Sequence, residues 1–429
     1  MASPPGPAPF RTPLAAELAQ GVLERFVRYV AIDTQSDLDS TSYPSTAKQL
    51  DLSRLLVSEL LELGLDDARL TEHGYVFATL PGTVEGPVVG LIAHVDTSPS
   101  ASGTGVTPIV HRVYDGSAIV LPGDISQSID PVETPELAAR LGHDIVTSDG
   151  TTLLGADDKA GVAEIMAAVA WLSAHPEVPR VPLRVGFTVD EETGRGTEFF
   201  DLEEFGAALA YTLDGSGCGS LEVESFSAKE IHIRIRGRGI HPGSAKGKLV
   251  NSVKLAAQLV AALPPDRLSP ETTEAREGFV HPYRIRGTTE ETVITLIARD
   301  HDDAALDAHV ALVQSLADDV ARREPRARVS VDVEFQYPNM RRAIDEHPRV
   351  VEAAVEAYRR VGVEPVFEPI RGGTDGARLS AAGLPTPNLF TGGQDYHSVR
   401  EWASVQDMAA AAAMVVELAG IWAAPAPSP

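Results

Sequence analysis

Residues 155–161 read Gly-Ala-Asp-Asp-Lys-Ala-Gly, and residues 161–175 continue them with apolar side chains at helical spacing. This pattern predicts a buried helix that begins just after Asp157 and Asp158. A helix N-terminus favours anions, so a simple helix cap by either aspartate would explain the pair. The second interpretation is a carboxylate that bridges two cations, one at each oxygen. The stretch by itself leaves both interpretations open.

Strands and helices alternate on both sides of this helix. Short apolar runs predict strands at 75–80, 87–93, 183–189 and 208–213, and amphipathic patterns predict helices at 14–29, 47–63 and 202–205. Such alternation is typical of an α/β layer with a mostly parallel sheet. The segment 97–152 is irregular and too long for an ordinary connection, so we expect it to line or cover a site.

The pattern changes near residue 220. In residues 229–236, isoleucines alternate with histidine and arginine, which is typical of an antiparallel sheet with one covered face. Further helices are expected at 250–263 and 305–322, and strands at 292–298 and 328–335.

The α/β pattern resumes at His347, with a helix at 350–361, a glycine-rich turn at 371–376 and a last helix near 405–421. We therefore predict a discontinuous α/β domain, residues 14–219 and 341–423, with a smaller α+β domain, residues 220–340, inserted into it.

Composition limits the partners of the chain. Its 429 residues favour two domains, and 36 basic against 61 acidic residues give a net charge of -25. Such a surface repels nucleic acid and anionic lipid, so we expect neither as a partner. The single cysteine, Cys218, excludes an intrachain disulfide and a Cys-x-x-Cys metal motif, which favours a reducing compartment.

The two ends of the sequence carry no sign of membrane targeting. Residues 1–13 are proline-rich and lack the basic and apolar regions of a signal peptide. We expect them to be disordered, as we do the tail at 424–429. No uninterrupted apolar run approaches the roughly 20 residues of a membrane span, which predicts a soluble, cytoplasmic protein.

Further acidic and histidine-containing stretches follow predicted strands or occupy loops. They are HVDT at 94–97, DEETG at 190–194, TLDG at 212–215 and YH at 396–397. Charged groups placed directly after apolar strands are costly unless something neutralises them, as a pair of divalent cations would. Each stretch alone has an ordinary explanation: a polar strand end, an exposed acidic loop, an Asx turn or a surface histidine. Together they favour a hydrolytic site with oxygen and nitrogen ligands.

Spacing suggests how these residues could divide the work. Side chains two apart on a strand face the same way, so Asp96 can hold one ring nitrogen of His94 while the other binds metal. Glu191 and Glu192 would repel each other if both were buried, so one can bind metal and the other act as general base. Five ligand candidates suffice for two zinc ions that share one carboxylate: His94, Asp157, Glu192, Asp214 and His397.

The complete set of motifs resembles the M20 family of dinuclear zinc peptidases, and within it the tripeptide aminopeptidases. The resemblance extends from about residue 14 to residue 419. It depends on HVDTSP at 94–99, GADDKAG at 155–161, EETG at 191–194, LDG at 213–215, HPGSAKG at 241–247, RGGTDG at 371–376 and the late histidine. The residues around that histidine, 394–396 and 398–400, depart from the usual pattern, which puts the pocket rim in doubt but keeps the ligand.

The resemblance implies a role for each residue. Asp157 would bridge two zinc ions, His94 and Asp214 would complete one site, and Glu192 and His397 the other. Asp96 would orient His94, Glu191 would be the general base, His241 would polarise the scissile carbonyl, and Asn251 and Arg371 would bind substrate. It also implies a cis peptide at Asp157-Asp158. Without the resemblance, His241 would be a turn residue and Asn251 a polar residue on the first turn of a helix. Arg371 would form a structural salt bridge.

The implied function is hydrolysis of the N-terminal peptide bond of tripeptides. The resemblance also implies that the protein is a homodimer. It implies that the inserted domain has a ferredoxin-like fold and acts as a lid or in dimerisation. The competing activities are those of a dipeptidase or an N-acyl amino acid deacylase of the same family. A catalytically silent metal-binding protein is the alternative from another class.

Overall fold

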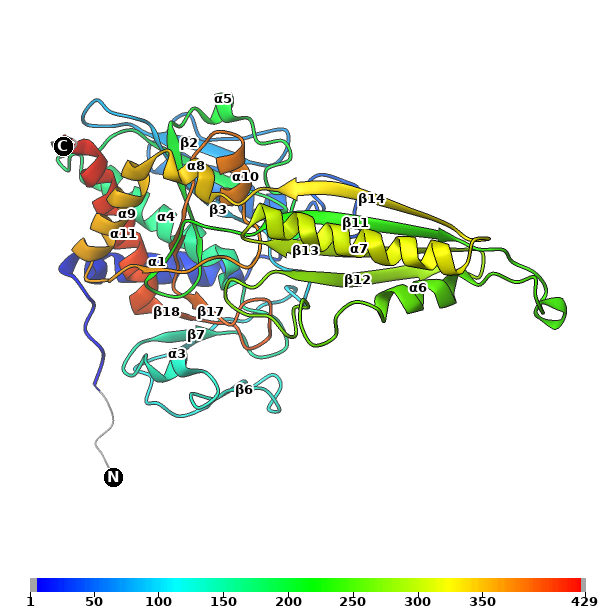
Figure 1. Ribbon diagram of the computed structural model, residues 1–429. Helices are drawn as coiled ribbons and strands as arrows, with labels where there is room; N and C mark the ends of the chain where they lie inside the picture. Colours follow the sequence, from blue (N-terminus) through cyan, green and yellow to red (C-terminus); the bar gives the residue numbers. More distant parts are fainter. Residues whose placement is uncertain (1–5, 426–429) are drawn as a thin grey trace. The chain divides into compact units, whose positions relative to one another are not determined.

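The computed structural model describes residues 6–425, and these separate into two units (Figure 1). Unit 1 contains the residues up to Val223, then Arg342–Glu368 and the chain from Thr374 onward. Unit 2 contains Glu224–Arg341 and a short returning segment, Pro369–Gly373. The sequence pattern gave no sign that this returning segment belongs with unit 2.

A mixed eight-stranded sheet forms the centre of unit 1. Its order is β1 (Arg69–Leu70), β2 (Val76–Leu80), β8 (Leu183–Thr188), β3 (Val89–His94), β9 (Leu209–Gly215), β16 (Asn388–Phe390), β10 (Ser220–Glu222) and β15 (Val366–Phe367). The four central strands, β8, β3, β9 and β16, are parallel. The antiparallel pairs β2–β8 and β16–β10 flank them. The predicted α/β class is confirmed, with a sheet that is parallel only in part.

Long helices cover this sheet. Helix α4 (Ala156–Ala174) packs on β3 and β9, and it also contacts α1 (Pro13–Val30) and α11 (Val405–Ala423). Helix α9 (Pro348–Arg360) packs on α11, and α2 (Gln49–Glu62) packs on β2. Every residue of β3 and β8 is buried, as expected for parallel strands covered on both faces.

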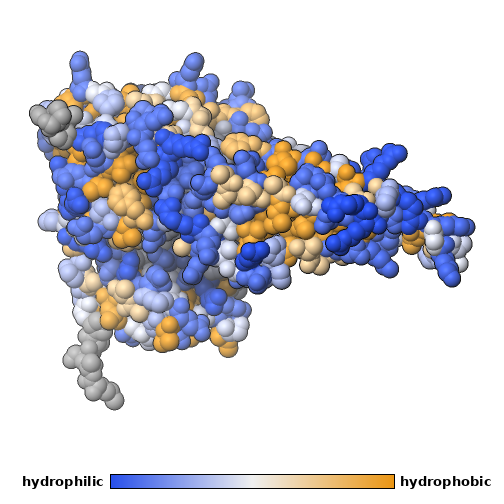
Figure 2. All heavy atoms as spheres, viewed as in Figure 1, coloured by the Kyte–Doolittle hydropathy of each residue, from blue (hydrophilic) through white to orange (hydrophobic). Residues whose placement is uncertain are grey.

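Helix α11 is long and apolar enough to cross a membrane by length and composition alone. In its most apolar window, 83% of the residues are buried inside the protein, so its apolar character is explained by the core. The molecular face in Figure 2 is mainly hydrophilic, with scattered apolar residues.

The segment 97–152, expected to be irregular, has short strands and a core of its own. It contains β4 (Ile109–His111), β5 (Ile119–Val120), β6 (Ser128–Ile129), the one-turn helix α3 (Pro135–Ala138) and β7 (Ile145–Thr147). Strand β7 pairs with β4 and with β18 (Trp402–Ser404), which in turn pairs with β17 (Gly393–Gln394). A buried cluster that includes Tyr114, Leu121 and Trp402 holds the segment together. It is thereby tied to the loop that contains His397.

The terminal segments lie partly beyond the described part of the chain. Residues 1–5 of the predicted lead-in and 426–429 of the predicted tail are outside it. Within it, the Ala8 N–H donates to the Gly142 carbonyl over 2.8 Å, and Phe10 packs half-buried against the core of unit 1. Residues 8–10 are therefore held against unit 1.

Unit 2 is a four-stranded antiparallel sheet with two helices on one face. The order is β12 (Phe279–Gly287), β13 (Glu291–Asp300), β11 (Ser227–Arg236) and β14 (Arg328–Tyr337), with α6 (Ser252–Val260) and α7 (Asp303–Arg323). The βαββαβ succession is the ferredoxin-like arrangement. Ile231, Ile233 and Ile235 are fully buried beneath the helices, as their alternation predicts. The sequence reading missed β12, whose register shifts between Pro282 and Arg284.

Candidate functional site

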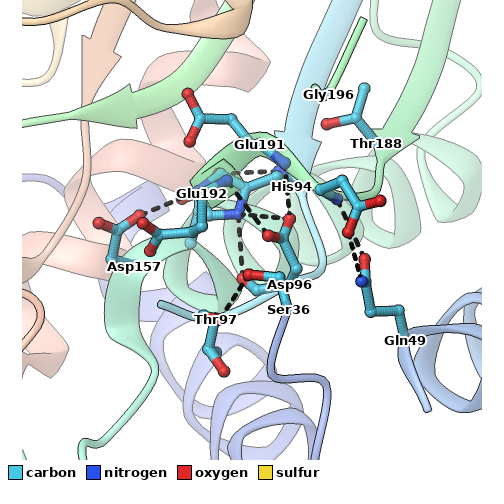
Figure 3. Close-up of polar contacts among 12 residues, drawn as sticks. Ser36, Gln49, His94, Asp96, Thr97, Asp157, Thr188, Glu191, Glu192 and Gly196 are labelled. Carbon is cyan, nitrogen blue, oxygen red and sulfur yellow. Dashed lines mark hydrogen bonds and ion pairs between the residues drawn. The ribbon is translucent and has the colours of Figure 1, made fainter. Parts of the chain in front are cut away.

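Three of the predicted ligands, His94, Asp157 and Glu192, lie close together at the carboxyl edge of the parallel strands of unit 1 (Figure 3). His94 ends β3, the residues 190–192 follow β8, and Asp214 lies near the end of β9. Parallel strands finish at one edge of a sheet, where ligands of open α/β folds bind. Asp157 reaches this edge from the first turn of α4.

His94 is oriented by the residue two positions later. Its Nδ1 lies 3.0 Å from the Asp96 carbonyl oxygen and 3.4 Å from Asp96 Oδ1. Its Nε2 then faces two other carboxylates, 2.9 Å from Asp157 Oδ1 and 3.6 Å from Asp214 Oδ1. Although burial opposes a charge on the ring, the hydrogen bonds to Asp157 and Asp214 raise the pKa of His94. One ring nitrogen is fixed, and the other is presented to the carboxylates.

Asp96 also holds the two glutamates. Its Oδ1 accepts the Glu191 N–H over 3.0 Å, and its Oδ2 accepts the Glu192 N–H over 3.2 Å. These bonds fix the 3-10 turn η1 (Glu191–Thr193) against the end of β3. Asp96 is fully buried, so the N–H groups supply part of the solvation its carboxylate has lost.

The residue before this turn is clamped from another direction. Asp190 has a left-handed backbone, with φ 60°, and is fully buried. Its carboxylate accepts a hydrogen bond from the Ser45 N–H and one over 2.6 Å from Gln49 Nε2. The Ser45 hydroxyl donates to it as well. The acidic loop is therefore held by the side chain of Asp190 as well as by the backbone N–H groups of Glu191 and Glu192.

Asp157 lies between two imidazoles. Its Oδ1 faces His94, and its Oδ2 is 3.1 Å from His397 Nε2, which is also 3.0 Å from Glu192 Oε2. The peptide bond between Asp157 and Asp158 is cis. Burial opposes ionisation of Asp157, yet the bonds to His397 and His94 lower its pKa. The same bonds to Asp157 and Glu192 raise the pKa of His397 to about 11.

The buried negative charge is only partly compensated by these imidazoles. Burial raises the pKa of Glu191 and Asp214, and burial together with the charge of Asp157 raises that of Glu192 to about 7. Glu192 Oε1 is buried and has no hydrogen-bond partner among residues 6–425. Ligand atoms of His94, Asp157 and Glu192 all lie within 4.8 Å of one another, as do those of His94, Asp158 and Asp214. This donor set and its unpaired oxygen fit divalent cations.

Comparison with known proteins identifies the family. The sequence model of peptidase family M20/M25/M40 matches residues 143–420. This chain belongs to that family. It is therefore a peptidase, an enzyme that hydrolyses peptide bonds, and the resemblance found in its motifs is confirmed.

Curated relatives of this peptidase match it over nearly their whole length. Peptidase T of Geobacillus thermodenitrificans is 46% identical over 403 residues, which are 94% of this chain and 98% of the relative. Peptidase T of Bacillus subtilis is 45% identical over 404 residues, again 94% and 98% of the two chains.

Solved structures of family members share the fold. The aminopeptidase PepT from Bacillus cereus has a TM-score of 0.72 at 24% identity and covers 95% of this chain and 99% of its own. A tripeptidase from Staphylococcus aureus has a TM-score of 0.74 at 23% identity, with coverages of 94% and 98%. A dinuclear metal-binding M20 peptidase from Bacillus subtilis has a TM-score of 0.63 at 16% identity, with coverages of 95% and 98%.

Three predicted site residues of the peptidase lie in unit 2, apart in sequence from the carboxylates of unit 1. His241 is exposed, and its Nδ1 accepts the Gly243 N–H over 3.1 Å. Asn251 caps α6 by accepting the Lys254 N–H over 3.2 Å. Within unit 2, therefore, these two have the turn and helix-start positions that their sequence context suggests.

Arg371 is held by main-chain carbonyls. Its Nη1 donates to the carbonyls of Ala275 and Glu277 over 2.9 and 2.8 Å. Its guanidinium also lies over the rings of Phe226 and Phe279, 5.3 and 5.7 Å from their centroids. These contacts join the returning segment of unit 2 to the loop before β12, where the sequence alone suggested a salt bridge.

Sequence reasoning missed two further carboxylates of the peptidase's site. Asp375 is buried, and its Oδ2 accepts the Thr188 hydroxyl over 2.7 Å, while burial raises its pKa to about 7. Glu401 is buried and contacts the main chain around Asp157. Asp375 had a signal, because it lies in the glycine-rich turn at 371–376. Glu401, between Arg400 and Trp402, had none.

Proposed function

We propose that this peptidase is an aminopeptidase of tripeptides that uses two zinc ions. The relatives named peptidase T, which it matches over 94% of its length, support the substrate class. The observation that carries the chemistry is the position of Asp157, whose two oxygens each face a different imidazole.

The proposed ligand set divides around that carboxylate. Asp157 would bridge the ions, with His94 and Asp214 at one and Glu192 and His397 at the other. Asp96 would keep His94 in the required tautomer through its contacts at Nδ1. When bound, such a pair of ions would acidify a shared water and polarise the scissile carbonyl.

Glu191 is the proposed general base. Its backbone is held by Asp96, while Figure 3 shows its carboxylate pointing away from that clamp, with no dashed contact. A carboxylate that is fixed at its backbone and directed away from these contacts can accept a proton from the attacking water. It would then deliver a proton to the departing amine.

The remaining roles follow the family resemblance. His241 would stabilise the developing oxyanion, and Asn251 and Arg371 would bind the peptide. We also propose a homodimer in the cytoplasm, with residues 220–340 acting as lid or dimerisation domain and the rest as catalytic domain. The net charge of -25 supports the proposal that nucleic acid and membranes are not partners.

The decisive experiment compares di-, tri- and tetrapeptides with N-acyl amino acids, before and after chelation and after return of Zn²⁺. Mass spectrometry identifies the product. We expect the first residue of unblocked tripeptides to be released fastest, with activity lost on chelation and restored by zinc. Faster cleavage of dipeptides or acylated amino acids would instead establish the corresponding alternative. No turnover of any substrate by the metal-replete protein would indicate a catalytically silent binding protein.

A further inference from the structure

One buried carboxylate connects the segments that carry Asp157 and His397. Glu401 is 1% exposed, and its Oε2 accepts the N–H groups of Leu154 and Gly155 over 2.9 and 2.7 Å. Its Oε1 accepts the Asp157 N–H over 3.0 Å. These three donors surround a charge that would otherwise be costly to bury.

The bonds act beside the local cap of α4, which Asp158 supplies. The first N–H groups of a helix have no partner within it, and a nearby side chain usually accepts them. Asp157 and Asp158 have non-helical backbones, so the Asp157 N–H precedes the first regular turn of α4 and needs an acceptor from elsewhere in the chain. Because Glu401 accepts the Asp157 N–H from outside the helix, the Asp157 carboxylate remains directed at His94 and His397.

Glu401 itself is firmly placed. It directly precedes β18, which is paired on both sides, with β17 and with β7. It also follows His397 by four residues, so one side chain relates the positions of two proposed ligands that are 240 residues apart in sequence. A shift of either segment would strain the same group of hydrogen bonds.

We propose that Glu401 is a positioning residue of the metal centre: its three main-chain hydrogen bonds hold Asp157 where both carboxylate oxygens can be used. The inference rests on the proposed bridging role of Asp157 and extends it to a residue outside the ligand set. It requires that Glu401 affect zinc binding through the positions of its two carboxylate oxygens, which accept the three hydrogen bonds, and not through the volume of its side chain.

The test measures Zn²⁺ affinity of the whole protein by competition with a chromogenic chelator, alongside kcat and KM. In Glu401→Gln the volume is kept, but the amide NH₂ must face at least one of the three N–H groups. We expect zinc affinity to fall about 10- to 100-fold, the usual effect of losing an outer-shell partner. At saturating zinc, kcat should fall more than KM rises.

Glu401→Asp separates the two possible roles. Aspartate keeps both acceptor oxygens on a shorter side chain, so a positioning role predicts tighter zinc binding for Asp than for Gln. A packing role predicts the reverse order, which would overturn the proposal. This ordering is read from zinc affinity, so it does not depend on activity.

Two further variants complete the design. Asp144→Asn removes a mostly buried carboxylate of unit 1 that accepts the Val113 N–H over 2.9 Å, and it should leave zinc affinity unchanged. In an Asp157→Asn background, Glu401→Gln should add little further loss, since its effect passes through Asp157. Full additivity, or wild-type affinity in Glu401→Gln, would overturn the inference alone. Failure of the wild-type protein to bind zinc would overturn the proposed function and the inference together.

Discussion

Asp157 and Asp158 are neighbours in sequence, but their carboxylates have different partners. Asp158 is the capping residue, because its Oδ1 accepts the Gly161 N–H over 3.2 Å and its Oδ2 accepts the His94 N–H over 3.1 Å. Asp157 instead directs both oxygens at imidazoles. The helix-cap interpretation therefore holds for Asp158, and the geometry of Asp157 is the one that its proposed bridging role requires.

Glu191→Gln should abolish turnover while zinc content stays near that of the wild-type protein. Glutamine cannot accept the proton of the attacking water, so kcat should fall by at least about 100-fold. Kinetics and metal analysis of the same sample test this. Glu192→Gln is the matched comparison and should lose zinc as well as activity. Substantial turnover by Glu191→Gln would remove the residue from its proposed role.

At this scale, the sequence identified residues whose chemistry is visible in a local motif. The proposed ligands lie in short, polar stretches next to apolar strands, and the structure brings all five together. Asp190 and Glu401 are different, because their importance comes from contacts with Gln49 and Asp157, which are 141 and 244 residues away. A local pattern contains no information about such partners.

At the scale of the elements, length and amphipathic pattern decide what can be predicted. Strands β3, β8 and β9 are mostly apolar, and their observed ends lie within one or two residues of the predicted ends. Strands β4 to β7 have only two or three residues each, too few to show a period. Pro282, which has no N–H to donate, weakened the evidence for β12.

Glu224 stabilises unit 2 by joining the loop before β12 to the segment that follows β14. Its Oε1 accepts a bond from Arg276 over 2.8 Å, and its Oε2 lies 3.2 Å from Arg341 Nη1. Hydrogen bonding by Arg276 lowers the pKa of Glu224 from its ordinary value of about 4.5 to about 2. A lowered pKa in the folded state means that this stabilisation is present above about pH 4.5 and is lost as the pH falls towards 2.

Glu224→Gln should therefore reduce the free energy of unfolding at pH 7 by about 2 kcal/mol. Both arginines are about half exposed, so solvent screening keeps the effect below the full value implied by the pKa shift. Urea unfolding at pH 7, 5 and 3 measures the difference between variant and wild type. The difference should narrow as the pH falls from 5 to 3, and a constant difference would contradict this account of the ion pairs.

At the scale of the whole molecule, the predicted α/β domain with an α+β insertion is present, together with its ferredoxin-like strand order. The segment 369–373 could not be assigned, because five residues carry no periodic pattern and are placed only by contacts such as those of Arg371. Strands β10, β15 and β16 of the large sheet were missed for a similar reason, because each has only two or three residues.

Removal of metal should destabilise unit 1 selectively. Ligands that bind only the folded state add stability, about 4 kcal/mol at a free concentration 1,000 times Kd. Calorimetry of the zinc-loaded and chelated protein should show a transition that moves to lower temperature on chelation, with any transition of unit 2 unchanged. Identical thermograms in the two conditions would contradict a folded-state zinc site.

The discontinuity of unit 1 also sets an order of events during synthesis. Apart from residues 369–373, unit 2 is complete once Arg341 has emerged from the ribosome. Unit 1 must wait for β16 and then for α11, whose five consecutive alanines at 409–413 are fully buried. Until α11 has been synthesised, the apolar surfaces of α1, α4 and α9 that it covers remain exposed. Unit 1, which completes its fold after unit 2, is therefore the part of the nascent chain that is prone to aggregation and to chaperone binding.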